Sequence, residues 1–293
     1  MILLLAGLMP SITSKQSLCA REALAKSLEQ YYNRKGFENE EASPYIRDQY
    51  RIFSESGLSD QDIAKTSAAF SIALMGNTIP ATFWLVYHIF SNETILHDCR
   101  KELLAVLQKS LNGGTSLDPM SVEQSCPIFS STLKETLRTH SMGTSVTQVV
   151  EDQVIDNHYL LKKGALVLIP AVVQHSDKSA WGENVNDFDY LRFVRASSNK
   201  KKSWNPAADR VFGGGWTLCP GRLAAMSFML GFAASAIMSF DIQPSSGQWV
   251  TPTVKNSNLA TAINQPDEDL DIQIHYREGD EWANSFTQLK PRV

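Results

Sequence analysis

The sequence is poor in cysteine, with only four in 293 residues. They stand far apart and unevenly spaced, at Cys19, Cys99, Cys126 and Cys219. No Cys-x-x-Cys pair occurs, which excludes the common patterns of zinc-binding modules and redox dithiols, and nothing indicates a disulfide framework. We therefore expect a protein of a reducing, intracellular compartment.

The sequence also lacks an excess of positive charge. Lys and Arg number 27 against 31 Asp and Glu, which gives a formal net charge of -4. Nucleic acid is therefore not an expected partner, because phosphate binding needs a basic surface. Hydrophobic residues make up 43% of the chain, enough to bury a sizeable core.

No stretch of the sequence is a clear membrane anchor or targeting signal. The apolar start, MILLLAGLMP, is about ten residues long, which is too short to cross a bilayer. It has neither a basic flank nor a clear cleavage site, so it is a poor signal peptide. The apolar stretch at 67–90 is long enough to span, but its polar residues and Pro80 favour a central buried helix.

Helical patterns dominate the rest of the chain. Ser59, followed by two acidic residues, is typical of a helix N-cap and predicts a long helix over residues 60–90. Pro127 suits the first turn of another helix. The other predicted elements are that helix (127–140), strands within 146–175 with a hairpin turn at 162–164, a loop (211–222) and a helix (220–238). The predicted fold class is mainly α with a smaller β portion.

The long predicted helix contains a distortion of its own. Pro80 has no N–H, so the carbonyl of Gly76 loses its helical partner and meets the proline ring. We therefore expect the helix to kink or open at Gly76–Asn77. On the residues alone, this is a bend in a core helix.

One segment, FGGGWTLCPGR at 212–222, places Cys219 at the end of a glycine run. Glycine allows backbone conformations and close approaches that other residues forbid. Zinc partners are missing near Cys219, and no histidine forms a known local signature with it. The interpretation that remains is a Cys219 thiolate that binds a metal cofactor through one axial bond. The positive end of the following helix would favour the negative charge of that thiolate. The simpler alternative is a buried free cysteine beside a glycine turn.

This segment resembles the haem loop of the cytochrome P450 superfamily. The pattern F-x-x-G-x-x-x-C-x-G is matched by Phe212, Gly215, Cys219 and Gly221. The resemblance implies that the loop backbone, with Gly213 in the same glycine run, lies along a haem b whose iron is bound by the Cys219 thiolate.

Two further segments resemble the same family. KETLR contains Glu135 and Arg138, which share one helix face, and FDYLRF contains Arg192, although the family usually has a proline where Tyr190 stands. On the residues alone, Glu135 and Arg138 are most simply a solvated surface pair. The resemblance instead implies a buried hydrogen-bonded network of Glu135, Arg138 and Arg192 that braces the haem loop.

The resemblance implies a haem-thiolate monooxygenase. Such an enzyme inserts one oxygen atom into an apolar substrate, here of lipid, steroid or terpenoid type, with electrons from a reductase. A protein of this kind in eukaryotes is expected to be anchored to the endoplasmic reticulum membrane.

The long helix departs from the commonest family pattern. GNTIPATFW is similar to the branch that holds prostacyclin synthase and the bile-acid-forming sterol hydroxylases. Gly76 aligns with the acid and Asn77 with the threonine of the usual oxygen-binding groove, and a shift of one residue would put Thr78 there. Asparagine can donate and accept hydrogen bonds but cannot relay a proton as an acid does. An oxygen-independent isomerase or dehydratase on the same fold is therefore an alternative.

The residues that would hold the haem propionates are less clear. Thr217 stands where the family often has an arginine, and Gln148 stands where another basic residue is usual. His140 is an outside candidate, and its simpler role is that of a helix C-terminal residue favoured by the helix dipole.

Chains of this family are considerably longer than 293 residues. We therefore expect residues 1–293 to form a single incomplete domain, the C-terminal portion of the cytochrome P450 fold, with the N-terminal half absent. A non-catalytic fragment that holds haem poorly is the third functional alternative.

Overall fold

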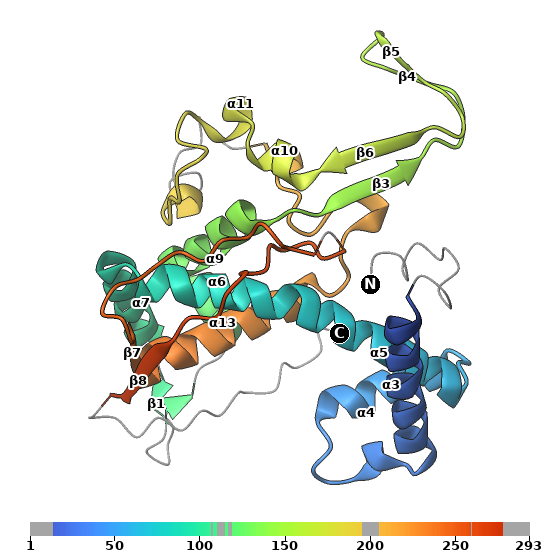
Figure 1. Ribbon diagram of the computed structural model, residues 1–293, viewed down its shortest axis with the longest axis horizontal. Coiled ribbons are helices and arrows are strands. Elements are labelled where there is room, and N and C mark those ends of the chain that lie inside the picture. Colours follow the sequence, from blue (N-terminus) through green and yellow to red (C-terminus); the bar gives the residue numbers. More distant parts are fainter. Residues whose placement is uncertain are drawn as a thin grey trace. The chain divides into compact units, whose positions relative to one another are not determined.

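The computed structural model describes residues 14–106, 108–109, 115–116, 119–194, 205–258 and 260–277. The described part is mainly helical with short two-stranded sheets, which confirms the predicted fold class (Figure 1). The apolar segment at residues 1–10 lies outside the described residues. The chain divides into two compact units, Met1–Gly76 and Asn77–Val293. The prediction of one incomplete domain over 1–293 is not tested by this division and stays a prediction.

The first unit is a small cluster of helices. Its elements are α3 (Lys15–Asn33), the 3-10 turn η1 (Gly36–Glu38), α4 (Pro44–Glu55) and α5 (Asp60–Ala73). The Ser59 hydroxyl accepts a hydrogen bond from the Asp62 N–H at 3.2 Å, so the predicted cap is confirmed. Tyr32 is buried at the centre, where its ring stacks on Tyr50 and its hydroxyl lies 2.9 Å from Ser67 Oγ.

A π-helical turn, η2 (Leu74–Thr78), separates α5 from α6 (Ile79–Phe90). The boundary between the two units falls inside this turn, after Gly76. This π-helical turn is where the structure opens the helix, at the predicted position Gly76–Asn77. Pro80 has no N–H to donate to the Gly76 carbonyl, and a wider turn accommodates the missing hydrogen bond. By length and composition alone, Asp60–Phe90 and Arg222–Ser239 could each cross a membrane, but buried core helices pass the same test.

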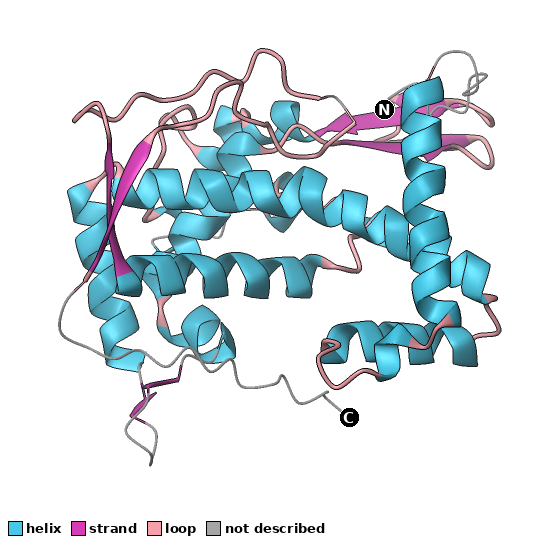
Figure 2. Ribbon diagram, turned by 60° about the horizontal axis from the view of Figure 1, so that its bottom comes forward, coloured by secondary structure: helices cyan, strands magenta, loops and turns pink. Residues whose placement is uncertain are grey.

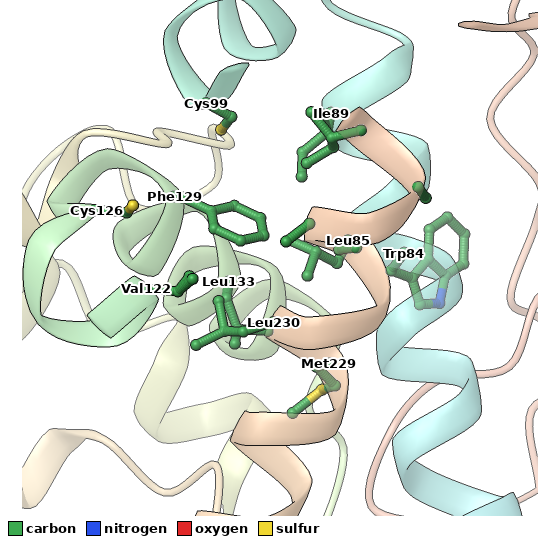
Figure 3. Packing of buried hydrophobic residues seen from close by; sticks show 14 of the residues in the cluster. Trp84, Leu85, Ile89, Cys99, Val122, Cys126, Phe129, Leu133, Met229 and Leu230 are labelled. Carbon is green, nitrogen blue, oxygen red and sulfur yellow. The ribbon is translucent and has the colours of Figure 1, made fainter. Parts of the chain in front are cut away.

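The second unit is built around packed helices (Figure 2). These helices share one apolar core. These helices are α6, α7 (Glu93–Val106), α8 (Pro119–Ser125), α9 (Pro127–His140) and α13 (Arg222–Ser239). Leu85 of α6, Phe129 and Leu133 of α9 and Leu230 of α13 are all buried in this core (Figure 3). Burying such side chains contributes about 1.5–3 kcal/mol each, so the packing fixes α9 and α13 against one another.

A carboxylate from α7 holds the start of α9. Glu102 accepts hydrogen bonds of 2.9–3.0 Å from the N–H groups of Ile128 and Phe129. These N–H groups have no partner within the helix, and a negative charge at a helix N-terminus is favourable. This cap sets the position of the helix that carries Glu135 and Arg138.

The strands of the second unit pair in short antiparallel ladders. β3 (Thr144–Gln148) pairs with β6 (Leu166–Pro170), and β4 (Gln153–Ile155) pairs with β5 (Tyr159–Leu161). β7 (Phe240–Pro244) pairs with β8 (Ile272–Tyr276), and β1 (Gln108–Lys109) pairs with β2 (Thr115–Ser116).

The strand region differs from the sequence-based expectation in two places. The chain reverses between the paired strands β4 and β5 at Asp156 and Asn157, both with positive φ. Asp and Asn tolerate this left-handed conformation. The predicted turn at 162–164 is present, closed by the Ala165 N–H to the Lys162 carbonyl at 3.0 Å, but it joins β5 to β6, which do not pair with each other. The expected strands also stop at Pro170, which offers no N–H to continue a ladder, and the short helix α10 (Ala171–His175) follows.

Candidate functional site

Glu135 lies at the centre of a buried network of charges. Its carboxylate accepts two hydrogen bonds of 2.8 Å from Arg138, through Nε and Nη2. Arg192 Nε adds bonds of 3.0 Å to both oxygens, and the Asp189 N–H adds another at 3.0 Å. The side chain of Glu135 is fully buried and that of Arg138 is 3% exposed. The structure thus brings together the three residues that the resemblance grouped, which we call the Glu135 network.

Backbone carbonyls accept the remaining donors of the two guanidinium groups. Arg138 Nη1 donates to the His175 carbonyl at 2.9 Å, and Arg192 donates to carbonyls of Trp181, Asn184 and Asp187 at 2.9–3.1 Å. The Arg138 guanidinium also lies 5.4 Å from the centre of the Trp181 ring. Because a buried charge is tolerated only when paired and hydrogen-bonded, this arrangement fixes the loop after α10 on α9.

His175 joins the Glu135 network to the start of the glycine loop. Its Nδ1 lies 3.0 Å from the Arg138 carbonyl, and its Nε2 accepts the Arg210 N–H at 2.9 Å. These partners fix the neutral tautomer with the proton on Nδ1, because a carbonyl only accepts and an N–H only donates. Burial lowers the pKa of His175, although the nearby Asp209 carboxylate acts in the opposite direction.

The glycine loop, residues 212–221, is closed by its own backbone. The Cys219 N–H donates to the Phe212 carbonyl at 2.9 Å, so the two ends of the loop are joined. Gly213 and Gly215 have φ of 77° and 60°, the left-handed region that glycine enters without strain. Between them and Cys219, the 3-10 turn η4 (Gly215–Thr217) reverses the chain.

Cys219 differs from the other cysteines in its surroundings. Cys99 and Cys126 are buried, and burial raises the pKa of both thiols, that of Cys126 to about 12. Cys219 is half-buried, and a Cβ added to Gly221 would lie 3.9 Å from its Sγ. Helix α13 begins three residues after it, so the N-terminus of the helix lies close in sequence to the sulfur.

Exposed apolar side chains lie on both sides of Cys219 in the sequence. Trp216 is fully exposed, and Leu218 and Leu223 are 40% and 66% exposed. A thiol on a glycine loop among exposed apolar side chains can take an apolar, planar cofactor at the sulfur. These residues therefore fit a thiolate-ligated haem.

The three residues predicted for the oxygen groove share the π-helical turn η2. Asn77 Oδ1 accepts the Ala262 N–H at 2.7 Å, and the Thr78 carbonyl accepts the Thr82 hydroxyl at 2.8 Å. Gly76, Asn77 and Thr78 are all half-buried. The bond from Ala262 fixes the orientation of the Asn77 amide, because its oxygen is already the acceptor of a backbone donor.

A segment near the C-terminus, residues 261–264, was missed by the sequence reasoning. Ala262 contacts Asn77 through its N–H, and its carbonyl accepts the Met142 N–H at 2.8 Å. Asn264 donates its N–H to the His140 carbonyl at 2.9 Å, and its own carbonyl accepts Trp84 Nε1 at 2.8 Å. The segment thus connects α6 with the end of α9. Its backbone groups bond to distant backbone and side-chain groups, and the sequence offers no pattern for such long-range contacts.

His140 is held inside the protein. Its Nε2 lies 2.9 Å from His88 Nε2, and its ring stacks on Trp84 with centroids 4.0 Å apart. Burial lowers the pKa of His88 to about 4 and that of His140 to about 3, and for His140 the neighbouring His88 adds to the effect. His88 also stacks on Phe188. Both rings are therefore neutral parts of the core near pH 7.

Comparison with known proteins identifies a family for most of the chain. The family model described as Cytochrome P450 matches residues 9–268. A "Cytochrome P450 monooxygenase nodJ" of Hypoxylon pulicicidum is 30% identical over 98% of this chain and 58% of its own length.

Mammalian relatives are similar over nearly the same region. "Cytochrome P450 7A1" of Rattus norvegicus is 27% identical over 92% of this chain and 56% of its own length. A "Cholesterol 7-alpha-monooxygenase" of Cricetulus griseus is 26% identical, with the same shares. The predicted similarity to the sterol hydroxylases is thereby confirmed. The chain spans about half the length of the curated relatives it matches.

Proposed function

This chain belongs to the cytochrome P450 family. From that premise we propose that it functions as a haem-thiolate monooxygenase in which the Cys219 thiolate is the axial ligand of the iron. The observation that carries the proposal is the half-buried thiol at the closed end of the glycine loop. When bound, a haem with a thiolate ligand supplies reductive activation of oxygen. The substrate is proposed to be an apolar lipid, steroid or terpenoid.

The residues of the loop have separate parts in this proposal. Gly213 and Gly215 let the backbone follow the haem without side chains between them, and Phe212 fixes the entry of the loop by packing against the helical core. Gly221 leaves open the space beside the Cys219 sulfur. Because α13 starts just beyond, the positive end of its dipole lies near the sulfur that would bind the iron.

The Glu135 network is proposed to act on the loop from a distance. Glu135, Arg138 and Arg192 touch neither the loop sulfur nor a substrate in this proposal, so their role is structural. His175 transmits their position to Arg210, at the start of the loop. A fixed loop holds Cys219 where one axial bond can form.

The oxygen groove is proposed to lie at the π-helical turn, with Gly76, Asn77 and Thr78. A π-turn in a long helix frees backbone carbonyls and is common at functional sites. Asn77, held by Ala262, can orient a bound molecule by hydrogen bonding. Electrons are proposed to come from a reductase, and the protein is proposed to lie at the endoplasmic reticulum membrane, as the family resemblance implies.

The absorbance spectrum of the reduced, carbon-monoxide-bound protein tests the proposal. The 293-residue chain, reconstituted with haem, should give the red-shifted Soret band of thiolate ligation. Cys219→Ser should lose that band, while the matched variant Cys19→Ser, at an exposed cysteine of α3, should keep it. A chain that takes up no haem would overturn the proposal and favour the non-catalytic alternative.

Asn77 supports a second candidate function, that of an oxygen-independent isomerase or dehydratase. An amide whose oxygen already accepts the Ala262 N–H cannot relay a proton as a carboxylic acid would. Turnover distinguishes the two. A monooxygenase requires a reductant and oxygen, whereas an isomerase converts an already oxygenated substrate, such as an endoperoxide, without either.

A further inference from the structure

The guanidinium of Arg210 lies beside the glycine loop. Arg210 lies two residues before Phe212, and its Nε is buried without a hydrogen-bond partner. Within the described ranges, it is the one buried side-chain nitrogen or oxygen in that state. A buried donor without an acceptor is costly and rare in proteins. Its presence therefore points to an acceptor that binds there.

The Arg210 guanidinium lies against the loop itself. A Cβ atom on Gly214 would overlap Arg210 Nη1, so a side chain at 214 would compete with the guanidinium for the same space. The backbone of Gly214 is extended, with φ of 178°, and any residue could adopt it. Glycine at 214 thus leaves room for Arg210, in contrast to Gly213, whose φ itself favours glycine.

The backbone of Arg210 is firmly held. Its N–H donates to Nε2 of the buried His175, and Nδ1 of His175 is hydrogen-bonded in turn to the Arg138 carbonyl. The neighbouring Asp209 turns one carboxylate oxygen toward the Val211 N–H at 3.1 Å. The base of the Arg210 side chain is therefore fixed by the Glu135 network before any ligand arrives, which lowers the entropic cost of binding.

Two of the three residues considered for the propionates have partners within the protein. The Thr217 hydroxyl donates to the Gly214 carbonyl at 3.0 Å, and His140 is paired with His88 in the core. Gln148 is exposed at the end of β3, and an uncharged amide matches a carboxylate less well than a guanidinium does. A cation for the carboxylates is thus missing from these three positions.

We propose that Arg210 binds a propionate carboxylate of haem through its guanidinium. This inference rests on the proposed function, because it takes haem as the ligand of the loop. A guanidinium is the side chain best matched to a carboxylate, with parallel N–H donors for two oxygens. Haem carries its carboxylates at one edge of an otherwise apolar ring, so a ring lying along the glycines can reach a cation beside the loop.

The test compares two cofactors that differ only in charge at that edge. The haem-free 293-residue chain is titrated with ferric haem and with haem dimethyl ester, and binding is followed by Soret absorbance. Arg210→Met should weaken haem binding about tenfold or more, the value of a charged hydrogen bond. It should change binding of the dimethyl ester by less than about twofold, since the ester has no carboxylate to lose. The haem affinity of Arg210→Lys should lie between those of the wild type and Arg210→Met, because lysine keeps the positive charge but lacks the two parallel N–H donors of a guanidinium.

The control is Arg21→Met, which removes the same charge at an exposed position of α3 and should change neither affinity. Equal weakening of both cofactors by Arg210→Met, or no weakening of either, would overturn the inference and leave the proposed function standing. Failure of the wild-type chain to bind haem would overturn both. If the Met variant does not fold by circular dichroism, equal affinities of Arg210→Lys and wild type for haem would overturn the inference.

Discussion

The Glu135 network and the glycine loop are built on opposite principles. In the network, the buried side chains of Glu135 and Arg138 and the partly buried side chain of Arg192 exchange several hydrogen bonds, and backbone carbonyls accept the remaining donors. The loop is half-exposed and is closed by one backbone bond between Cys219 and Phe212. The first region is saturated with internal partners, whereas the second contains a half-buried thiol, Cys219, and a guanidinium, Arg210, whose Nε has no hydrogen-bond partner.

This difference indicates that the Glu135 network contributes stability and that the glycine loop is available for ligand binding. A saturated buried network has nothing left with which to bind a ligand, and removing one member leaves the others as unpaired buried charges. A loop with few internal bonds contributes little to stability and can present its sulfur. His175 is the link between the two, since it contacts Arg138 on one side and Arg210 on the other.

The largest effect is expected in the network. Glu135→Gln keeps the shape of the side chain but leaves Arg138 and Arg192 buried without a negative partner. The cost should be about 3–5 kcal/mol of unfolding free energy, measured by urea denaturation monitored by circular dichroism. The control Glu151→Gln, at an exposed position, should change stability by less than about 0.5 kcal/mol. If Glu135→Gln lowered the free energy of unfolding by less than about 1 kcal/mol, the Glu135 network would contribute no more to stability than an exposed position, which would contradict this comparison.

A pH-dependent effect is expected in the same helical core. Burial lowers the pKa of His88 to about 4 and that of His140 to about 3, from an ordinary value of 6.5. Below pH 6.5 the unfolded chain therefore binds more protons than the folded chain, and stability falls as the pH is lowered. Between pH 6.5 and about 4, the loss from His88 alone should be roughly 3 kcal/mol.

Replacing both rings with phenylalanine tests this expectation. The double variant His88→Phe, His140→Phe keeps aromatic stacking on Phe188 and Trp84 and should flatten the pH dependence of the urea midpoint over that range. His97→Phe, at an exposed position on α7, is the control and should leave the slope unchanged. An unaltered slope in the double variant would show that the His88–His140 pair is not buried as described.

A smaller effect is expected in the loop. Gly213 and Gly164 both have positive φ, 77° and 85°, so alanine is strained at each by about 1–2 kcal/mol. At Gly213 the new Cβ would also lie 3.1 Å from the Thr217 carbonyl, whereas at Gly164 nothing lies within 4 Å. Gly213→Ala should therefore cost about 1 kcal/mol more than Gly164→Ala in urea denaturation. Equal costs would mean that the loop relaxes freely around position 213.

Local patterns in the sequence were sufficient for the long helix and for part of the network, but α4 (Pro44–Glu55) lies in a stretch that reads as polar and connective. The cap at Ser59 and the opening at Gly76–Asn77 follow from side-chain chemistry within one or two turns, and the structure has both. The spacing of Glu135 and Arg138 put them on one helix face, but a surface pair was as consistent with that spacing as a buried one. Family resemblance, and not periodicity, grouped them with Arg192.

Contacts between distant segments were beyond such patterns. The pairing of Asn77 with Ala262, 185 residues apart, and that of β7 with β8 depend on tertiary packing, which leaves no local signal. Arg210 was missed for the same reason, as was the contact of His175 with Arg138 and Arg210, since these partners lie far from His175 in the sequence. The turn at Asp156–Asn157 was missed because Lys162–Gly164 offered a competing glycine signal.

The central claim is that Cys219 is present for chemistry and not for packing, and Cys219→Ser tests it most directly. The account predicts that the haem-free variant unfolds within about 0.5 kcal/mol of the wild type, as expected for a half-buried side chain without a buried partner to lose, while the thiolate Soret band of the haem-loaded protein is lost. A loss of more than about 2 kcal/mol together with a retained band would contradict it, and would make Cys219 a packing residue of the glycine turn.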